Sequence, residues 1–147
     1  MDAGDAVPDF ELPDQNGVPR RLSTLLKDGP VVLFFYPAAM TAGCTAETCH
    51  FRDLAAEFAV AGAQRIGISP DTVDKQQQFA QKHSFDFPLL ADTDRRVAEL
   101  FGVKRTHGFS PVKRSTFVID TDQTLRAVIH SEFSMEKHAD EALAALR

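Results

Sequence analysis

The 147-residue sequence predicts an α/β fold with a central mixed sheet flanked by helices. Two observations predict it. Strand-like apolar runs alternate with helix-like amphipathic runs along the chain, and short joints containing Gly, Pro or Asp separate them. A hydrophobic fraction of 44% over this length suits one compact domain, residues 1–147, with its own core.

The N-terminal part of the chain predicts a hairpin followed by a buried strand. Residues 10–12 alternate like a short strand, and the turn sequence at 14–17 precedes residues 20–26. We expect an N-terminal β-hairpin and a short turn of helix there. Residues 31–36 are apolar at nearly every position, which predicts a central strand buried on both faces, and Pro37 ends it.

The middle of the chain alternates helices and strands. Apolar residues recur at helical spacing over residues 45–61, so we expect one continuous helix that Gly62 terminates. Gln64–Ser69 is typical of another buried strand, and Val73–His83 of an amphipathic helix.

The last third of the chain adds further strands and helices. Leu89–Ala91 predicts a short strand, and residues 94–101 predict a helix that ends at a glycine. Residues 116–120 and Leu125–His130 flank a turn and predict a hairpin. Met135–Leu146 predicts a closing helix.

Charge and composition exclude several function classes. A net charge of −5 gives no electrostatic reason to expect nucleic-acid binding. No apolar stretch approaches the length of a membrane span, and the acidic N-terminus is unlike a secretory signal, so we expect a cytoplasmic protein. Two cysteines are too few for a disulfide scaffold, and a close pair in a reducing compartment favours catalytic or redox chemistry.

Cys44 and Cys49 are the most informative residues of the chain. They are its only thiols, and they follow the predicted central strand where a helix is expected to begin. Unpaired backbone N–H groups and the positive end of the helix dipole favour a thiolate at such a place. The thiolate is the reactive form of cysteine.

A motif match identifies a family. Pro37, Thr41 and Cys44 reproduce the Pro-x-x-x-Thr-x-x-Cys signature of peroxiredoxins, and residues 35–53 resemble the bacterioferritin comigratory protein (PrxQ) branch. Residues 7–10 and 114–120 also stand where that family would have them. The predicted order of elements is that of the thioredoxin-like fold, with the N-terminal hairpin as an extension.

The resemblance implies a thioredoxin-dependent peroxidase of the atypical two-cysteine type, which needs no cofactor. Cys44 would attack hydrogen peroxide or an organic hydroperoxide and become a sulfenic acid, releasing water or an alcohol. Cys49 would condense with that sulfenic acid to give an intramolecular disulfide, which a thioredoxin-like protein would reduce. A buried core thiol is the alternative for Cys49.

The resemblance also assigns catalytic and substrate-binding roles around Cys44. Arg114 is the candidate cation that holds the thiolate and the peroxide oxygens; a surface ion pair is the alternative. Thr41 offers a hydroxyl to the substrate or the thiolate, and it can also serve as a helix N-cap. Gly43 belongs to the expected substrate-binding set.

Two further positions have structural alternatives. Pro37 is expected to shape the pocket wall and keep water from the sulfur, and it also terminates the strand. Glu47 matches a position that is usually acidic in this branch, and it could order a hydrogen-bond network near the thiol. A solvated glutamate that interacts favourably with the helix dipole is the other interpretation of Glu47.

Cys44 and Cys49 are too far apart in a regular helix to form a disulfide. Residues five apart in an ideal α-helix lie about 8.7 Å apart at Cα, whereas a disulfide spans roughly 4.4–6.8 Å. We therefore expect the thiol-bearing helix to unwind locally when the protein is oxidised.

The chain departs from the usual pattern of the branch in the loop before the thiol. Ala38 and Ala39 replace a charged and a polar residue, and Ala42 replaces a frequent proline. We expect an altered substrate preference or rate rather than loss of activity. The five histidines do not stand at metal-ligand spacings, so no metal site is expected, even though His50 adjoins Cys49.

Two other function classes stay open. A thioredoxin-like disulfide reductase would normally carry Cys-x-x-Cys, whereas four residues separate the thiols here. A non-enzymatic redox sensor or binding module could keep the same fold. No long exposed apolar stripe is predicted, which favours a monomer.

Overall fold

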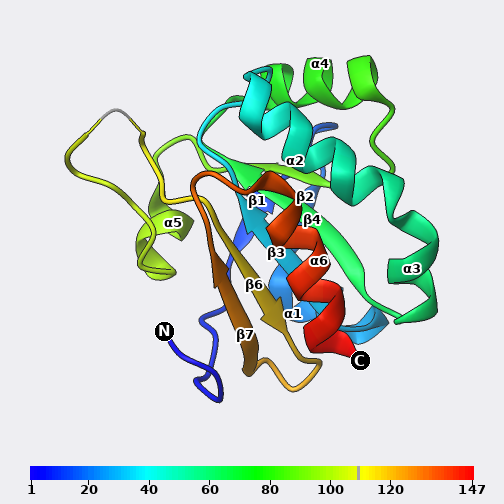
Figure 1. Ribbon diagram of the computed structural model, residues 1–147. Helices are drawn as coiled ribbons and strands as arrows, with labels where there is room; N and C mark the ends of the chain where they lie inside the picture. Colours follow the sequence, from blue (N-terminus) through cyan, green and yellow to red (C-terminus); the bar gives the residue numbers. More distant parts are fainter. Residues whose placement is uncertain (109) are drawn as a thin grey trace.

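A five-stranded mixed sheet forms the centre of the computed structural model, which describes residues 1–108 and 110–147 (Figure 1). Its strands stand in the order β5-β4-β3-β6-β7. The three strands β3, β4 and β5 run parallel, whereas β6 is antiparallel to both β3 and β7. Their bounds are β3 (Val31–Phe35), β4 (Gln64–Ser69), β5 (Leu89–Ala91), β6 (Ser115–Ile119) and β7 (Leu125–His130).

The predicted N-terminal hairpin forms a separate two-stranded sheet of β1 (Glu11–Pro13) and β2 (Pro19–Arg21). Its turn is fixed by Asp14, whose Oδ1 accepts the backbone N–H groups of Asn16 at 2.8 Å and Val18 at 3.0 Å. A short helix, α1 (Leu22–Leu25), and a 3₁₀ turn, η1 (Leu26–Asp28), follow the hairpin.

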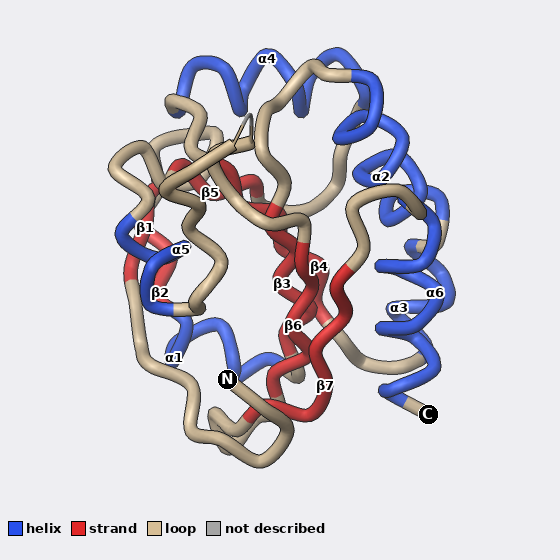
Figure 2. Tube along the Cα trace, turned by 60° about the vertical axis from the view of Figure 1, so that its left-hand side comes forward, coloured by secondary structure: helices blue, strands red, loops and turns tan. Residues whose placement is uncertain are grey.

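Helices cover both faces of the sheet (Figure 2). The helices after α1 are α2 (Ala42–Asp53), α3 (Ala55–Val60), α4 (Val73–His83), α5 (Arg96–Leu100) and α6 (Met135–Leu146). Side chains from α2, α3, α4 and α6 share one buried cluster, and side chains from α1, α5 and the hairpin share the other. The predicted mixed sheet flanked by helices is thereby confirmed.

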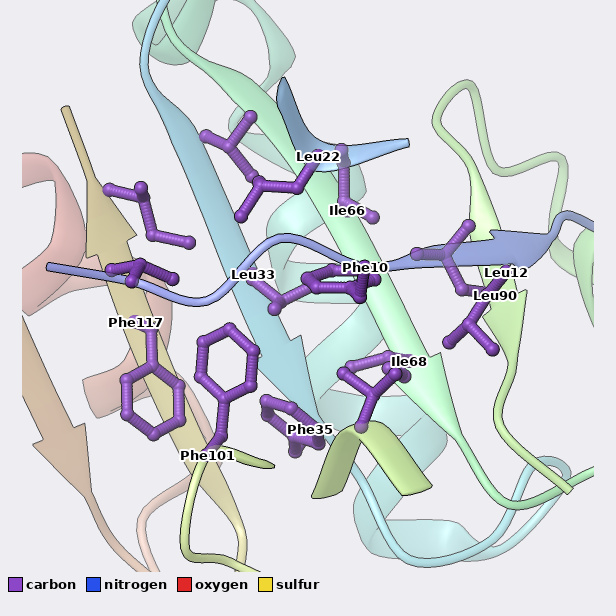
Figure 3. Packing of buried hydrophobic residues seen from close by; sticks show 14 of the residues in the cluster. Phe10, Leu12, Leu22, Leu33, Phe35, Ile66, Ile68, Leu90, Phe101 and Phe117 are labelled. Atoms are coloured by element: carbon purple, nitrogen blue, oxygen red, sulfur yellow. The ribbon is translucent and has the colours of Figure 1, made fainter. Parts of the chain in front are cut away.

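Figure 3 is a close-up of the buried cluster on the side of α1, α5 and the hairpin, which contains several aromatic rings. Phe35 and Phe117 come from the neighbouring strands β3 and β6, and their ring centroids lie 5.7 Å apart in an edge-to-face arrangement. Phe101 packs on both rings, at 5.4 Å from Phe35 and 5.0 Å from Phe117. These contacts pack the end of β3 against β6, near the point where the thiol-bearing segment leaves the sheet.

The prediction of one helix over residues 45–61 is wrong. The helix begins earlier, at Ala42, and breaks at Leu54, whose φ of −96° and ψ of 21° are not helical. The carbonyl of Phe51, which a continuous helix would pair with residue 55, accepts a hydrogen bond at 3.1 Å from Nη1 of Arg65. This cross-link from β4 fixes the end of α2.

Other boundaries differ from prediction by one or two residues. The predicted strand 31–36 ends at Phe35, the predicted helix 94–101 is confined to Arg96–Leu100, and the predicted strand 116–120 is Ser115–Ile119. Within the described ranges, no helix combines the length and the apolar character needed to cross a membrane.

The sheet register determines where the site forms. Antiparallel pairing places Phe35, the last residue of β3, opposite Ser115, the first residue of β6. The segment that leaves β3 toward α2 therefore lies beside Arg114, the residue that enters β6.

Candidate active site

Cys44 is the third residue of α2 and is completely buried. Its backbone carbonyl accepts a hydrogen bond at 2.7 Å from the hydroxyl of Thr48, one turn further along the helix. The first turn of α2 thus presents the sulfur toward the protein interior. Thr48 was not identified from the sequence.

Arg114 reaches the sulfur of Cys44. Its Nη2 donates to Cys44 Sγ at 3.3 Å, and its Nη1 donates to Glu47 Oε1 at 2.7 Å. The residue is 7% exposed, so it is not the surface ion pair that was the alternative interpretation. The guanidinium bridges the thiol and the carboxyl, a geometry that suits its fixed fork of donors.

Gly43, in the first turn of α2, lies next to the guanidinium. A Cβ atom at this position would lie 3.4 Å from Arg114 Nη2 and 3.6 Å from Met135 Sδ. Both distances are ordinary van der Waals contacts, so Gly43 is a close neighbour of Arg114 and a methyl group would fit there. Met135, the first residue of α6, is a further neighbour of this site, and its sequence position gave no sign of it.

Glu47 is fully buried, so the interpretation as a solvated glutamate is wrong. Burial raises the pKa of its carboxyl to about 8, and the favourable charge and hydrogen bond of Arg114 offset only part of that effect. Its Oε1 is bound to Arg114, but its Oε2 has no hydrogen-bond partner among the described residues.

His138 lies next to Glu47 and was not identified from the sequence. Its Nε2 is 2.8 Å from the Ser131 carbonyl and 3.6 Å from Glu47 Oε2, and its Nδ1 is 2.8 Å from the Thr116 hydroxyl. Burial lowers the pKa of its imidazole. Its place in the apolar stripe of α6, four residues before the buried Ala142, was the available signal.

Thr41 stands immediately before α2 and is exposed. It occupies the N-cap position, but its side chain makes no capping hydrogen bond, and its hydroxyl donates to the Ala38 carbonyl at 2.7 Å instead. Since the single hydroxyl hydrogen is used in this way, the oxygen can act toward a ligand only as an acceptor. Pro37 is half-buried at the start of the same loop.

Asp71 anchors the loop that carries Thr41. Its Oδ2 accepts hydrogen bonds from Ala39 N and from Ser69 Oγ, both at 2.7 Å. The buried Gln76 connects Ser69 Oγ, at 2.8 Å, to the Tyr36 hydroxyl, at 2.6 Å. The loop between β3 and α2 is therefore tied to the end of β4 and to α4.

Cys49 lies on the same helix as Cys44 but in a different environment. It is half-buried, and it lines a surface cavity of about 500 Å³ between α2 and the start of α6. Burial raises the pKa of its thiol, an effect that Arg52 opposes and Asp53 reinforces. Both cysteines are free thiols.

The neighbour of Cys49, His50, pairs with α6. Its Nε2 lies 2.8 Å from Asp140 Oδ1. Within residues 1–108 and 110–147, His, Cys, Asp and Glu side chains form no group of three or more that could hold a metal ion.

A family model, curated relatives and solved structures all match this chain, and all three belong to the same family. The model of the AhpC/TSA family matches residues 3–128. Peroxidoxin BcpB from Mycobacterium tuberculosis is 65% identical, with a TM-score of 0.95 over 99% of this chain and 96% of that one. The chloroplastic peroxiredoxin Q of Sedum lineare is 40% identical over 98% of this chain and 77% of its own length.

A third relative has been studied for its alkyl peroxide reduction activity. It is the bacterioferritin comigratory protein of Xanthomonas campestris, which is 30% identical, with a TM-score of 0.86 over 97% of each chain.

Proposed function

Because the chain belongs to the AhpC/TSA family of peroxiredoxins, with a thioredoxin fold, we propose that it reduces hydrogen peroxide and organic hydroperoxides with Cys44 as the attacking sulfur. The observation that carries this proposal is the 3.3 Å contact between Arg114 Nη2 and Cys44 Sγ. A buried guanidinium favours an ionised sulfur, and the ionised sulfur is the nucleophile.

In the first step the Cys44 thiolate attacks one peroxide oxygen and the O–O bond breaks. The sulfur becomes a sulfenic acid, and the leaving oxygen takes up a proton and departs as water or an alcohol. Negative charge moves from the sulfur to the leaving oxygen during this step. Arg114 stabilises that charge because its donors are already oriented toward the sulfur.

Thr41, Gly43 and Pro37 complete the substrate site in this proposal. The Thr41 oxygen accepts the hydrogen of the peroxide O–H, because its own hydrogen is bound to the Ala38 carbonyl. Gly43, in the first turn of α2, lies beside the guanidinium and next to the place of the substrate. Pro37 forms the wall that limits access of water, with no part in the chemistry.

Cys49 resolves the sulfenic acid. Its thiolate attacks the oxidised sulfur of Cys44, and the S–OH oxygen takes up the proton that the Cys49 thiol gave up and leaves as water, which gives an intramolecular disulfide. Both thiols lie within the continuous helix α2. Residues five apart in a helix are about 8.7 Å apart at Cα, beyond the span of a disulfide, so α2 unwinds in part before the bond forms.

A dithiol protein of the thioredoxin type then returns two electrons to the disulfide. The cavity beside Cys49 supports access of such a partner, and Phe133, which is 97% exposed, offers an apolar contact at its rim. A reducing compartment such as the cytoplasm fits this cycle. All reacting groups come from one chain, so a monomer is sufficient.

Sustained turnover tests the proposal. Purified protein is mixed with hydrogen peroxide, thioredoxin, thioredoxin reductase and NADPH, and NADPH oxidation is followed. We expect many equivalents of peroxide to be consumed per protein, with none consumed by Cys44→Ser. A single equivalent followed by arrest would indicate a redox sensor, and insulin reduction without peroxide consumption would indicate a disulfide reductase.

A further inference from the structure

The buried cluster behind the thiol contains an imbalance of charge. Cys44, Arg114, Glu47 and His138 follow one another in space, and the exposed fraction of each is 7% or less. Arg114 is the permanent cation of this set. If both the sulfur and the carboxyl were ionised beside a neutral imidazole, the cluster would hold two negative charges against one positive charge.

We propose that Glu47 stores a proton while Cys44 is a thiolate and releases it once the sulfur has been oxidised. This inference rests on the proposed attack by Cys44. It makes Glu47 a positioning and proton-storing residue, because its carboxyl acts on the sulfur through Arg114.

The hydrogen bonds around Glu47 support a neutral carboxylic acid. The Ser131 carbonyl can only accept, so the 2.8 Å contact requires a hydrogen on Nε2 of His138. That hydrogen is directed to Ser131, and Glu47 Oε2, 3.6 Å away, receives no hydrogen bond. A buried carboxylate with one unpartnered oxygen is costly, and protonation removes the charge.

The other charged groups near the cluster act in the same direction or are already paired. Glu132, in the segment before α6, contributes to raising the pKa of Glu47, and its Oε1 is bound to Arg105 Nη2 at 2.9 Å and to Arg114 N at 3.1 Å. Burial is the largest influence on His138 and lowers the pKa of its imidazole, as does the charge of Arg114. The hydrogen bond to Ser131 and the charges of Glu132 and Glu141 oppose this effect only in part, so the net shift favours the neutral imidazole. The stored proton therefore resides on the carboxyl.

The reaction consumes one proton, and a protonated Glu47 can account for it. Attack of the thiolate on R′OOH yields Cys44–SOH and the anion R′O⁻, so one proton must be supplied to form R′OH. The sulfur loses two electrons and the peroxide gains them. When the thiolate charge disappears, Arg114 has lost one anionic partner, and ionised Glu47 replaces it. The proton that Glu47 gives up thus balances the proton that the leaving anion takes up, and the cluster stays neutral.

Infrared difference spectroscopy tests the proposal directly. The Cys49→Ser variant is used so that the sulfenic acid on Cys44 persists, and spectra are taken before and after one equivalent of hydrogen peroxide. We expect a protonated-carboxyl C=O band to be lost and carboxylate bands to be gained. The lost band shifts when the protein is labelled with ¹³C-glutamate, which needs no further mutation.

Two variants in the Cys49→Ser background assign the band. Glu47→Gln should lack it, whereas Glu132→Gln, which changes the neighbouring carboxyl, should keep it. Trapping with dimedone in the same samples confirms that Cys44 has been oxidised. If Cys44 forms the sulfenic acid and no glutamic acid band is lost, or if the band persists in Glu47→Gln, the proton store is excluded. If no sulfenic acid forms, the proposed function itself fails.

Discussion

Arg114 Nη2 lies 3.3 Å from Cys44 Sγ, although 70 residues separate the two in the chain. The contact depends on the antiparallel pairing of β3 with β6, which places the exit of one strand beside the entrance of the other. A cation fixed by the sheet therefore meets a thiol fixed by the first turn of a helix. Neither side chain has to move far for the charge pair to form, which is the preorganisation that a reactive thiolate requires.

The rate of sulfenic acid formation should depend on the forked geometry of the Arg114 guanidinium as well as on its positive charge. We expect Arg114→Ala to slow sulfenic acid formation about 10²–10³-fold. Arg114→Lys should recover only part of the rate, because an ammonium cannot bridge Cys44 and Glu47 as the fork does. The control is Arg105→Lys, which alters the other arginine bound to Glu132. Stopped-flow rates equal for Arg114→Lys and wild type would contradict this role.

Oxidation should unfold part of α2. In the disulfide form, amide hydrogen exchange should accelerate in Ala42–Asp53, and the Thr48 to Cys44 hydrogen bond should be lost. Peptides from α6 serve as an internal reference. The Cys49→Ser variant, treated with the same peroxide, should keep its protection because it cannot form the bond. Unchanged exchange in a fully oxidised wild type would exclude the unwinding.

Thr41 should contribute through its oxygen as an acceptor. Thr41→Val keeps the shape but removes the hydroxyl, and we expect the peroxide reaction to slow about tenfold, the value of one neutral hydrogen bond of about 1.4 kcal/mol. Thr41→Ser retains the oxygen and should react within about threefold of wild type. Equal rates for Val and Ser variants would show that the hydroxyl does not contact the substrate.

Glu47 should make stability depend on pH in a defined direction. Its pKa is about 8 in the folded protein against an ordinary value of 4.5, so folding favours the protonated form. This contribution to the free energy of unfolding is complete below 4.5 and is lost as the pH rises toward about 8. The loss amounts to a few kcal/mol, at about 1.4 kcal/mol per pKa unit.

Glu47→Gln removes this pH dependence. Relative to the variant, the reduced wild type should become progressively less stable between pH 4.5 and 8 in urea unfolding experiments. Curves of unfolding free energy against pH that stay parallel over this range would mean that the carboxyl is ionised in the folded protein throughout.

Much of the fold was predictable because local patterns agree with tertiary structure. The apolar run that became β3 and the turn chemistry at Asp14 both signal their elements within a few residues. The break at Leu54 had no such signal. It depends on Arg65, which donates to the Phe51 carbonyl from a strand 14 residues away. A helical period in the sequence cannot report a competing donor from elsewhere.

Some residues of the candidate site were predictable from the sequence and others were not. The candidates Pro37, Thr41 and Cys44 came from the resemblance to the peroxiredoxin signature, and Arg114 came from its matching position in that family, because the local pattern alone left a surface ion pair equally open. His138 and Asp71 were not predictable, because an isolated histidine in an apolar stripe and an aspartate in a turn are common in many folds. Their neighbours, Glu47 and the backbone of Ala39, are brought to them only by the packing of α6 and β4.

The most direct test of the central claim, that Cys44 is the peroxide-reactive thiol and Cys49 its partner, is the mass and free-thiol count of the protein after one equivalent of hydrogen peroxide. Wild type should lose both thiols to an intramolecular disulfide. Cys49→Ser should gain one oxygen on Cys44, and Cys44→Ser should not react. If the two single variants reacted slowly and alike, Cys44 would be an ordinary thiol and the account would be wrong.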